Sequence, residues 1–166
     1  MKINPLPSLE LLNTFLHYDP ETGEFRWKKS PSNNVFENSI AGSKHPNGYI
    51  NIQFLNKDYR AHRLAYKMYY GIEPDGMLDH IDLNKSNNRI NNLRIATIAQ
   101  NQANTKARNT NRTGVKGVSL RSYGYIARFR FNKKEIHLGT YKTIEEASLA
   151  YEQATKKYFG EFARTS

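Results

Sequence analysis

Hydrophobic and polar positions alternate over short distances along the chain, which predicts many small elements rather than a few long ones. Apolar residues with helical spacing predict two short helices in the first two thirds of the chain, and period-two alternation predicts strands and a hairpin. The helices are expected at 8–16 and 63–70, strands at 24–28, 49–54 and 59–62, a short apolar strand at 77–81, loops at 30–38 and 84–91, and helical potential at 93–104.

The last third of the chain has a different pattern. Three strand-like runs are separated by turns, at 115–120, 125–131 and 135–138. Thr143 and Glu146 then have the spacing of a capping box, and the apolar face behind them predicts a helix that ends at Gly160. We therefore expect a three-stranded antiparallel sheet with one helix across its back.

Polar, basic residues without apolar periodicity lie between these two patterns and predict a linker. The expected organisation is a domain at 1–104, a linker at 105–112 and a second domain at 113–166. The fold class predicted for the whole chain is α+β.

The composition limits the chemistry. The chain of 166 residues contains no cysteine, which excludes disulfides and thiolate metal sites and favours a reducing compartment. No apolar run is long enough to cross a membrane, and the first residues do not have the pattern of a signal peptide. We expect a soluble protein of the cytoplasm, or of the host cytoplasm if a phage encodes it, with no membrane partner.

Positive charge is concentrated in the last third. The net charge of the chain is +10, and residues 105–166 hold 13 Lys or Arg against 5 Asp or Glu. A basic module joined to a nearly neutral one is typical of a nucleic-acid-binding domain fused to another function. The alternative is that the charge serves solubility or loose binding of polyanions.

The candidate chemistry begins with Asp79 and His80. At the end of a strand their side chains point to opposite sides of the backbone, so one can bind a metal ion while the other faces water. A hard divalent cation and a neutral imidazole are the groups that phosphodiester hydrolysis needs. In the alternative interpretation, Asp79 caps a turn and His80 fills a gap.

Asparagines follow this pair along the chain. Asn91 and Asn92 precede the apolar Leu93, and Asn101 lies nine residues after Asn92. Amide oxygens are hard neutral ligands that suit Mg²⁺ or Mn²⁺ better than zinc.

Together these runs resemble the HNH endonucleases of phages and their homing endonucleases. The resemblance covers about residues 5–104. It rests on the segments His62–Tyr66, Asp79–Asp82, Asn87–Arg94 and Gln100–Asn101, with two upstream segments, Tyr18–Trp27 and Gly48–Tyr49. It implies a ββα-metal core, which is a hairpin followed by a helix around one metal ion, and hydrolysis of a DNA strand to 5′-phosphate and 3′-hydroxyl ends.

The resemblance also implies roles for individual residues. Asp79 and Asn101 would bind one Mg²⁺ (or Mn²⁺) per active site, and His80 would be the general base. Asn92 would be the catalytic-site asparagine that fixes the loop and orients the backbone of His80. Asn101 replaces the last histidine of the family name, the H-N-N variant. His62 is expected either to contact a phosphate or to have a structural role.

The last third, at about 113–163, resembles the ethylene-response-factor (APETALA-type) DNA-binding domain. The residues that carry this likeness lie at 114–118, 125–130, 138–141 and 145–151. The face of the second strand with its arginines would lie in the DNA major groove. The positions expected to contact DNA are Lys116, Arg121, Tyr123, Arg128 and Arg130.

Three functions follow from these patterns. The leading hypothesis is a metal-dependent, site-directed endonuclease, such as a phage homing enzyme, that acts on double-stranded DNA as a monomer. The alternatives are a sequence-specific DNA-binding regulator with an inactive nuclease core and a general polyanion-binding protein.

Overall fold

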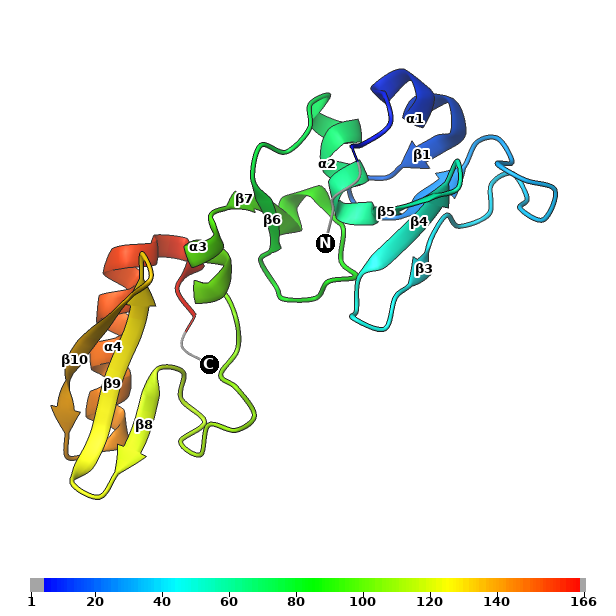
Figure 1. Cartoon of the computed structure of the whole chain (residues 1–166). Coiled ribbons are helices and arrows are strands. Elements are labelled where there is room, and N and C mark those ends of the chain that lie inside the picture. Colours follow the sequence, from blue (N-terminus) through cyan, green and yellow to red (C-terminus); the bar gives the residue numbers. More distant parts are fainter. Residues whose placement is uncertain (1–4, 165–166) are drawn as a thin grey trace. The chain divides into compact units, whose positions relative to one another are not determined.

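The protein consists of two compact units. The computed structural model describes residues 5–164, and the chain passes from one unit to the other between Ile95 and Ala96 (Figure 1). Both units combine helices with antiparallel strands, so the predicted α+β class is confirmed at this coarse level. No helix within residues 5–164 is long and apolar enough to cross a membrane.

The first unit begins with a helix and a strand pair. Ser8 caps helix α1 (Leu9–Phe15) through a hydrogen bond that the backbone N–H of Leu11 donates to its hydroxyl. The helix is predicted to include Leu16, but this residue has extended backbone angles and begins β1 (Leu16–Tyr18). Strand β1 pairs antiparallel with β2 (Phe25–Trp27).

A three-stranded sheet, ordered β3-β4-β5, follows. Its strands are β3 (Ser43–Lys44), β4 (Ile50–Phe54) and β5 (Lys57–Arg60). The returning strand is predicted at 59–62, but it ends at Arg60 and helix α2 (Ala61–Tyr70) begins directly. His62 therefore lies in the first turn of α2. The helix buries Ala61, Leu64 and Ala65 at helical spacing, which explains why a helix forms here.

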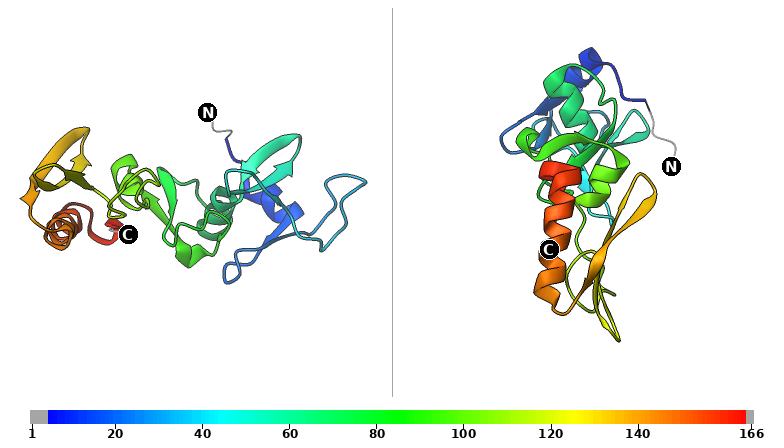
Figure 2. Two further views of the ribbon diagram at one scale, coloured as in Figure 1. Left: turned by 90° about the horizontal axis from the view of Figure 1, so that it is seen from below. Right: turned by 90° about the vertical axis from the view of Figure 1, so that its left-hand side faces the viewer.

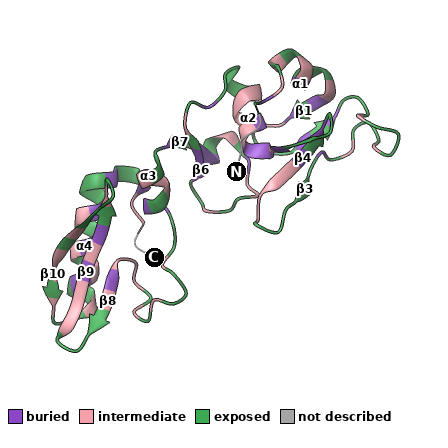
Figure 3. Cartoon of the chain, viewed as in Figure 1, coloured by how far each residue is buried: buried purple, intermediate pink, exposed green. Residues whose placement is uncertain are grey.

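The core of the first unit is built from aromatic and aliphatic side chains of these elements. The ring of Phe54 lies 5.3 Å from that of Phe15 and 6.2 Å from that of Trp27, measured between centroids. Leu12 and Ile52 are fully buried in the same core. Figure 3 shows buried positions on the same elements.

The segment that carries the predicted chemistry comes next. Strand β6 (Met77–His80) pairs with β7 (Leu93–Ala96), and the short 3₁₀ helix η1 (Ile90–Asn92) leads into β7. Helical structure is predicted from residue 93, but it is confined to α3 (Ile98–Ala103). Thr97 and Gln100 form a capping box there, which places the start of the helix after Thr97.

Helix α3 belongs to the second unit, so the division precedes the predicted boundary at residue 104. Ala96 and Ala103 are buried in the second core, with Ala99 packed against it. The segment 105–112, predicted as a linker, also lies within this unit.

The second unit has the predicted sheet and helix. Strands β8 (Val118–Arg121), β9 (Gly124–Phe131) and β10 (Lys134–Tyr141) form an antiparallel sheet in the order β10-β9-β8. Helix α4 (Ile144–Phe159) packs along this sheet, and the 3₁₀ helix η2 (Gly160–Phe162) follows (Figures 1 and 2). Thr143 and Glu146 form the predicted capping box at the start of α4.

One face of the sheet is closed by α4. Ala127 and Phe129 of β9 are buried in one cluster with Ala147, Tyr151 and Phe159 of the helix. Because side chains alternate along a strand, the arginines at 128 and 130 lie on the opposite face. The arginine-bearing face predicted for this strand is therefore present.

A close approach at Gly117 generates a stability prediction. This glycine has φ +72°, and a Cβ placed there would lie 1.9 Å from the Tyr151 ring and 2.6 Å from the carbonyl oxygen of Arg128. We expect Gly117→Ala to lower the free energy of unfolding by about 3 kcal/mol, since strain and overpacking add. Gly114→Ala is the control, because Gly114 has a similar φ of +69° but a Cβ placed there would meet nothing within 4 Å.

Chemical denaturation followed by circular dichroism measures both variants. Gly114→Ala should lose only about 1 kcal/mol, the cost of a left-handed backbone for alanine. Equal losses in the two variants would contradict the packing described for Gly117.

Candidate active site

Asp79 is a buried carboxylate held by an arginine. It lies in β6 and is only 4% exposed. Its Oδ2 accepts hydrogen bonds from Nε and Nη2 of Arg94, at 3.1 Å each. A buried carboxylate requires a positive partner, and Arg94 provides that charge.

His80, the next residue, faces a different set of neighbours. Its Nε2 lies 3.4 Å from Oδ1 of Asn88, whose own amide nitrogen donates to the carbonyl of Ser86. An amide oxygen only accepts, so this contact favours the tautomer with its proton on Nε2 and leaves Nδ1 as the basic nitrogen. Burial lowers the pKa of His80, although Asn88, Asp82 and Asp79 act in the opposite direction. The imidazole is therefore neutral at pH 7.

Asn92 ties together the loop that follows His80. Its Oδ1 accepts a hydrogen bond from the backbone N–H of Asp82 at 3.1 Å. Its Nδ2 donates to Oδ1 of Asp82 at 3.0 Å and to the carbonyl of Asn87 at 2.9 Å. The backbone of Ile81 also donates to the carbonyl of Asn92 at 3.0 Å. One asparagine thus fixes both ends of the loop.

Asp82 is held in its ionised form inside this loop. Partial burial opposes ionisation, but hydrogen bonds from Asn87 and Asn92 outweigh it and lower the pKa of the carboxyl group. The backbone N–H of Asn84 also donates to Oδ1 of Asp82, at 2.8 Å.

The upstream segment 18–23 supports the loop from one side. The hydroxyl of Tyr18 donates to the carbonyl of Asn88 at 2.7 Å, and the N–H of Ile90 donates to the carbonyl of Pro20 at 3.1 Å. A Cβ at Gly23 would lie 2.5 Å from the backbone nitrogen of Arg89, so only glycine permits this approach.

A second upstream segment, 47–49, contacts the loop as well. Ser86 donates its hydroxyl to the carbonyl of Gly48 at 2.9 Å, and Lys85 donates to the carbonyl of Asn47 at 3.3 Å. Both upstream segments entered the sequence analysis only as part of a resemblance, without a predicted physical role. In the structure both segments support the residues that surround His80.

His62 packs directly against His80. The two ring centroids are 5.1 Å apart, and the ring of Tyr49 lies 5.2 Å from His62 and 5.9 Å from His80. Nδ1 of His62 is buried without a hydrogen-bond partner among the residues that the structure describes. Burial, followed by the neighbouring His80 and two arginines, lowers the pKa of His62 to about 3. Two roles are expected for His62, a phosphate contact and a structural role. A buried, neutral ring favours the structural role.

Two cations beside this cluster are not apparent from the sequence. The guanidinium of Arg60 lies 4.8 Å from the centroid of the Tyr49 ring, and the ammonium of Lys85 lies 5.0 Å from it. Asn51 accepts a hydrogen bond from Arg60 at 2.9 Å. Arg94, the partner of Asp79, is likewise absent from the predicted residues. No spacing rule points to these residues, because they come from separate elements.

Asn101 lies in α3, where its backbone N–H donates to the carbonyl of Thr97 at 2.9 Å. Asp79 and Asn101 belong to different compact units, and a metal ion shared by them stays a prediction. Within residues 5–164 no group of three or more His, Asp or Glu side chains could hold a metal ion. A magnesium site does not require such a group, because Mg²⁺ is often bound by one or two protein oxygens, with water and phosphate completing the shell.

The residues expected to contact DNA have different environments in the second unit. Lys116 is half-buried, and its ammonium donates to the carbonyls of Gln102 (3.0 Å) and Ala103 at the end of α3. Burial, with the charge of Arg164, lowers the pKa of Lys116 to about 8. Arg128 forms an ion pair of 3.1 Å with Glu135 on the neighbouring strand.

The other three residues of this group, Arg121, Tyr123 and Arg130, are exposed, and Tyr123 has 70% of its surface in solvent. They lie in and beside the strands of the sheet, at the end of β8, in the turn to β9 and in β9. Their contact with DNA stays a prediction.

Comparison with known proteins concerns the segment that contains this site. Residues 59–103 match the family described as HNH endonuclease. This segment is therefore similar to HNH endonucleases. The match includes Asp79, His80, Asn92 and Asn101 and ends at the last residue of α3.

A similar protein occurs in a giant virus. The chain is 36% identical over 104 residues to a protein of Acanthamoeba polyphaga mimivirus described as an uncharacterized HNH endonuclease. The aligned part covers 61% of this chain and 54% of that relative, so the chain spans about half the length of the viral protein. No solved structure matches the chain.

The buried His62 generates a prediction about pH. Its folded-state pKa of about 3 lies below the value of about 6.5 for an unfolded histidine, so the unfolded chain takes up a proton that the folded first unit excludes. The stability that this residue contributes is complete above about pH 6.5 and is lost as the pH falls toward 3. Between pH 7 and pH 5 we expect the free energy of unfolding to fall by about 2 kcal/mol.

Urea denaturation at a series of pH values measures this dependence. His62→Gln should remove most of the loss between pH 7 and pH 5, leaving the smaller contribution of His80. His17→Gln, at an exposed position of β1, should behave as the wild type. An unchanged pH dependence in His62→Gln would contradict the burial of a neutral imidazole.

Proposed function

We propose that the protein is a metal-dependent DNA endonuclease that hydrolyses phosphodiester bonds. The observation that carries the proposal is that Asp79 and His80 stand next to each other in a segment that matches the HNH endonuclease family. Their side chains contact different neighbours, Arg94 for the carboxylate and Asn88 for the imidazole. Asp79 would thus bind the metal ion, and the adjacent residue His80 would transfer the proton.

Asp79 and Asn101 would hold one Mg²⁺ (or Mn²⁺) ion in this proposal. The donors are a carboxylate and an amide oxygen, which suit a hard cation. Such an ion would stabilise negative charge on the phosphate and on the leaving oxygen. Arg94 would share the carboxylate with the ion or release it, because both are attracted to the same negative charge.

His80 would be the general base. Its neutral form accepts a proton from the attacking water on Nδ1, while Asn88 holds the opposite nitrogen. The water oxygen would form a bond to phosphorus as the bond to the 3′ oxygen breaks, and the 3′ oxygen would take a proton from solvent, giving 5′-phosphate and 3′-hydroxyl ends. Asn92 acts through the loop: its hydrogen bonds to Asp82 and Asn87 hold the backbone that positions His80.

Arg60 and Lys85 would contribute positive charge beside the scissile phosphate. The guanidinium lies 4.8 Å and the ammonium 5.0 Å from the Tyr49 ring, and that ring is 5.9 Å from His80. Positive side chains in this position attract the DNA backbone toward the base.

The second unit would be an ethylene-response-factor-type domain that positions the cut on double-stranded DNA. Two features support this domain: the order of its three strands and the helix across one face of the sheet. Its positive charge supports it too, since residues 105–166 contain 13 Lys or Arg and 5 Asp or Glu. We further propose a phage homing or other site-directed nicking role for a monomer that acts in the cytoplasm. The viral relative supports a viral setting for this proposal.

One observation favours a second candidate, a DNA-binding regulator with an inactive core. The charge of Asp79 is already neutralised by Arg94. A buried carboxylate in a protein without a metal ion would need such a partner. In this case the basic unit would bind DNA and no strand would be cut.

A plasmid-nicking assay distinguishes the two candidates. With Mg²⁺ the wild type should convert supercoiled plasmid to nicked circles, and EDTA should stop it. His80→Ala should lower the rate by about 100-fold or more, the usual contribution of a general base. His17→Ala is the matched control, since His17 is exposed and lies outside residues 59–103.

DNA binding by all three proteins is measured in parallel in EDTA. Loss of nicking with unchanged binding in His80→Ala supports the endonuclease. Tight binding by the wild type without any Mg²⁺-dependent nicking would leave the regulator.

A further inference from the structure

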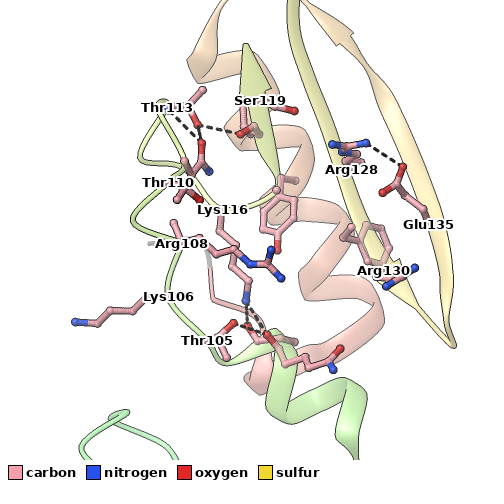
Figure 4. A pocket seen from close by; sticks show the side chains of 18 of the residues that line it. Thr105, Lys106, Arg108, Thr110, Thr113, Lys116, Ser119, Arg128, Arg130 and Glu135 are labelled. Carbon is pink, nitrogen blue, oxygen red and sulfur yellow. Dashed lines mark hydrogen bonds and ion pairs between the residues drawn. The ribbon is translucent and has the colours of Figure 1, made fainter. Parts of the chain in front are cut away.

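A groove within the second unit runs between the segment 105–113 and the sheet. It has a volume of about 1020 Å³. The segment forms one wall, and residues of β8, β9 and the turn before β8 form the floor and the opposite wall (Figure 4). The segment, which its composition predicts to be a linker, thus forms part of a concave surface.

The lining of the groove is strongly basic. It contains seven Lys or Arg side chains and one acidic residue, Glu135, which already pairs with Arg128. Three of the basic residues, Lys106, Arg108 and Arg112, come from the segment itself. In Figure 4, Arg108 extends into the groove toward Lys116, whereas Lys106 points away from it. A concave surface with charges of one sign concentrates a ligand of the opposite sign.

The segment is fixed to the unit by hydrogen bonds. Asn111 donates its amide N–H to the carbonyl of Val115 at 2.6 Å, and Thr113 donates its hydroxyl to the carbonyl of Val118 at 2.9 Å. On either side of the segment, the ammonium of Lys116 donates to the carbonyls of Gln102 and Ala103 at the end of α3. The basic side chains therefore project from an ordered wall, and a ligand need not order a flexible tail on binding.

We propose that this groove binds the phosphodiester backbone of one strand of duplex DNA, with Arg108 and Arg112 contacting phosphates. The inference rests on the proposed DNA-binding function and extends it to the segment 105–113 of the second unit. Arginine forms paired hydrogen bonds with phosphate oxygens, and threonine hydroxyls such as that of Thr110 also serve as phosphate donors. Backbone contacts of this kind add affinity without adding sequence specificity.

The salt dependence of binding tests the proposal. The full-length protein is titrated into a fluorescent mixed-sequence DNA duplex in EDTA, which prevents cleavage, at salt concentrations from about 0.05 to 0.2 M. Arg108→Gln with Arg112→Gln is compared with Lys156→Gln with Lys157→Gln. Both pairs are exposed, and both double variants remove two positive charges from the same unit, but Lys156 and Lys157 lie on α4 outside the groove.

The arginine variant should flatten the slope of log Kd against log salt by about two, since each lost phosphate contact removes about one. Its affinity should fall roughly tenfold or more at the lower salt concentrations, while the lysine variant keeps the slope of the wild type. Equal slopes in the two variants would overturn the groove as the site and leave DNA binding intact. Failure of the wild type to bind the duplex at any salt concentration would overturn the proposed function itself.

Discussion

The candidate active site depends on the burial of one negative charge. Asp79 is 4% exposed, so its carboxylate must have a positive partner at all times. Arg94, on the paired strand β7, supplies that partner through two contacts of 3.1 Å to a single oxygen. The same burial that makes the carboxylate costly would also strengthen its attraction to the divalent cation of the proposed function, because little solvent would screen the interaction. Arg94 would therefore be either the permanent counter-ion of Asp79 in an inactive core, or a counter-ion that a metal ion joins or replaces at the same carboxylate.

The rest of the first unit holds the neighbouring imidazole in place. Asn92 closes the loop after His80 from within, and two upstream segments support it from outside. The support is made largely of hydrogen bonds to backbone carbonyls and N–H groups, which fix the position of the loop. Such an arrangement suits a group that must stay neutral and well oriented to accept a proton.

Much of this organisation could be predicted from the sequence, and the limits have physical causes. The capping box at Thr143 and the three strands before it are local patterns, and the structure confirms both. Residues 93–96 have helical potential by composition, but pairing with β6 makes them a strand, a tertiary effect that periodicity cannot contain. The Arg94 partner of Asp79 and the groove wall at 105–113 depend on side chains that meet only after folding. The second unit likewise gains α3 because its alanines complete a distant core.

Binding of Mn²⁺ followed by NMR tests the central claim most directly, since the paramagnetic ion broadens amide signals near its site. Substoichiometric Mn²⁺ is added to isotope-labelled wild type, to Asp79→Asn, and to Asp58→Asn as a control at an exposed carboxylate of β5. Our account predicts selective broadening around Asp79 and around Asn101 in the wild type and the control, and its loss in Asp79→Asn. Sharp signals at Asp79 in the wild type, or the same broadening in Asp79→Asn, would contradict it.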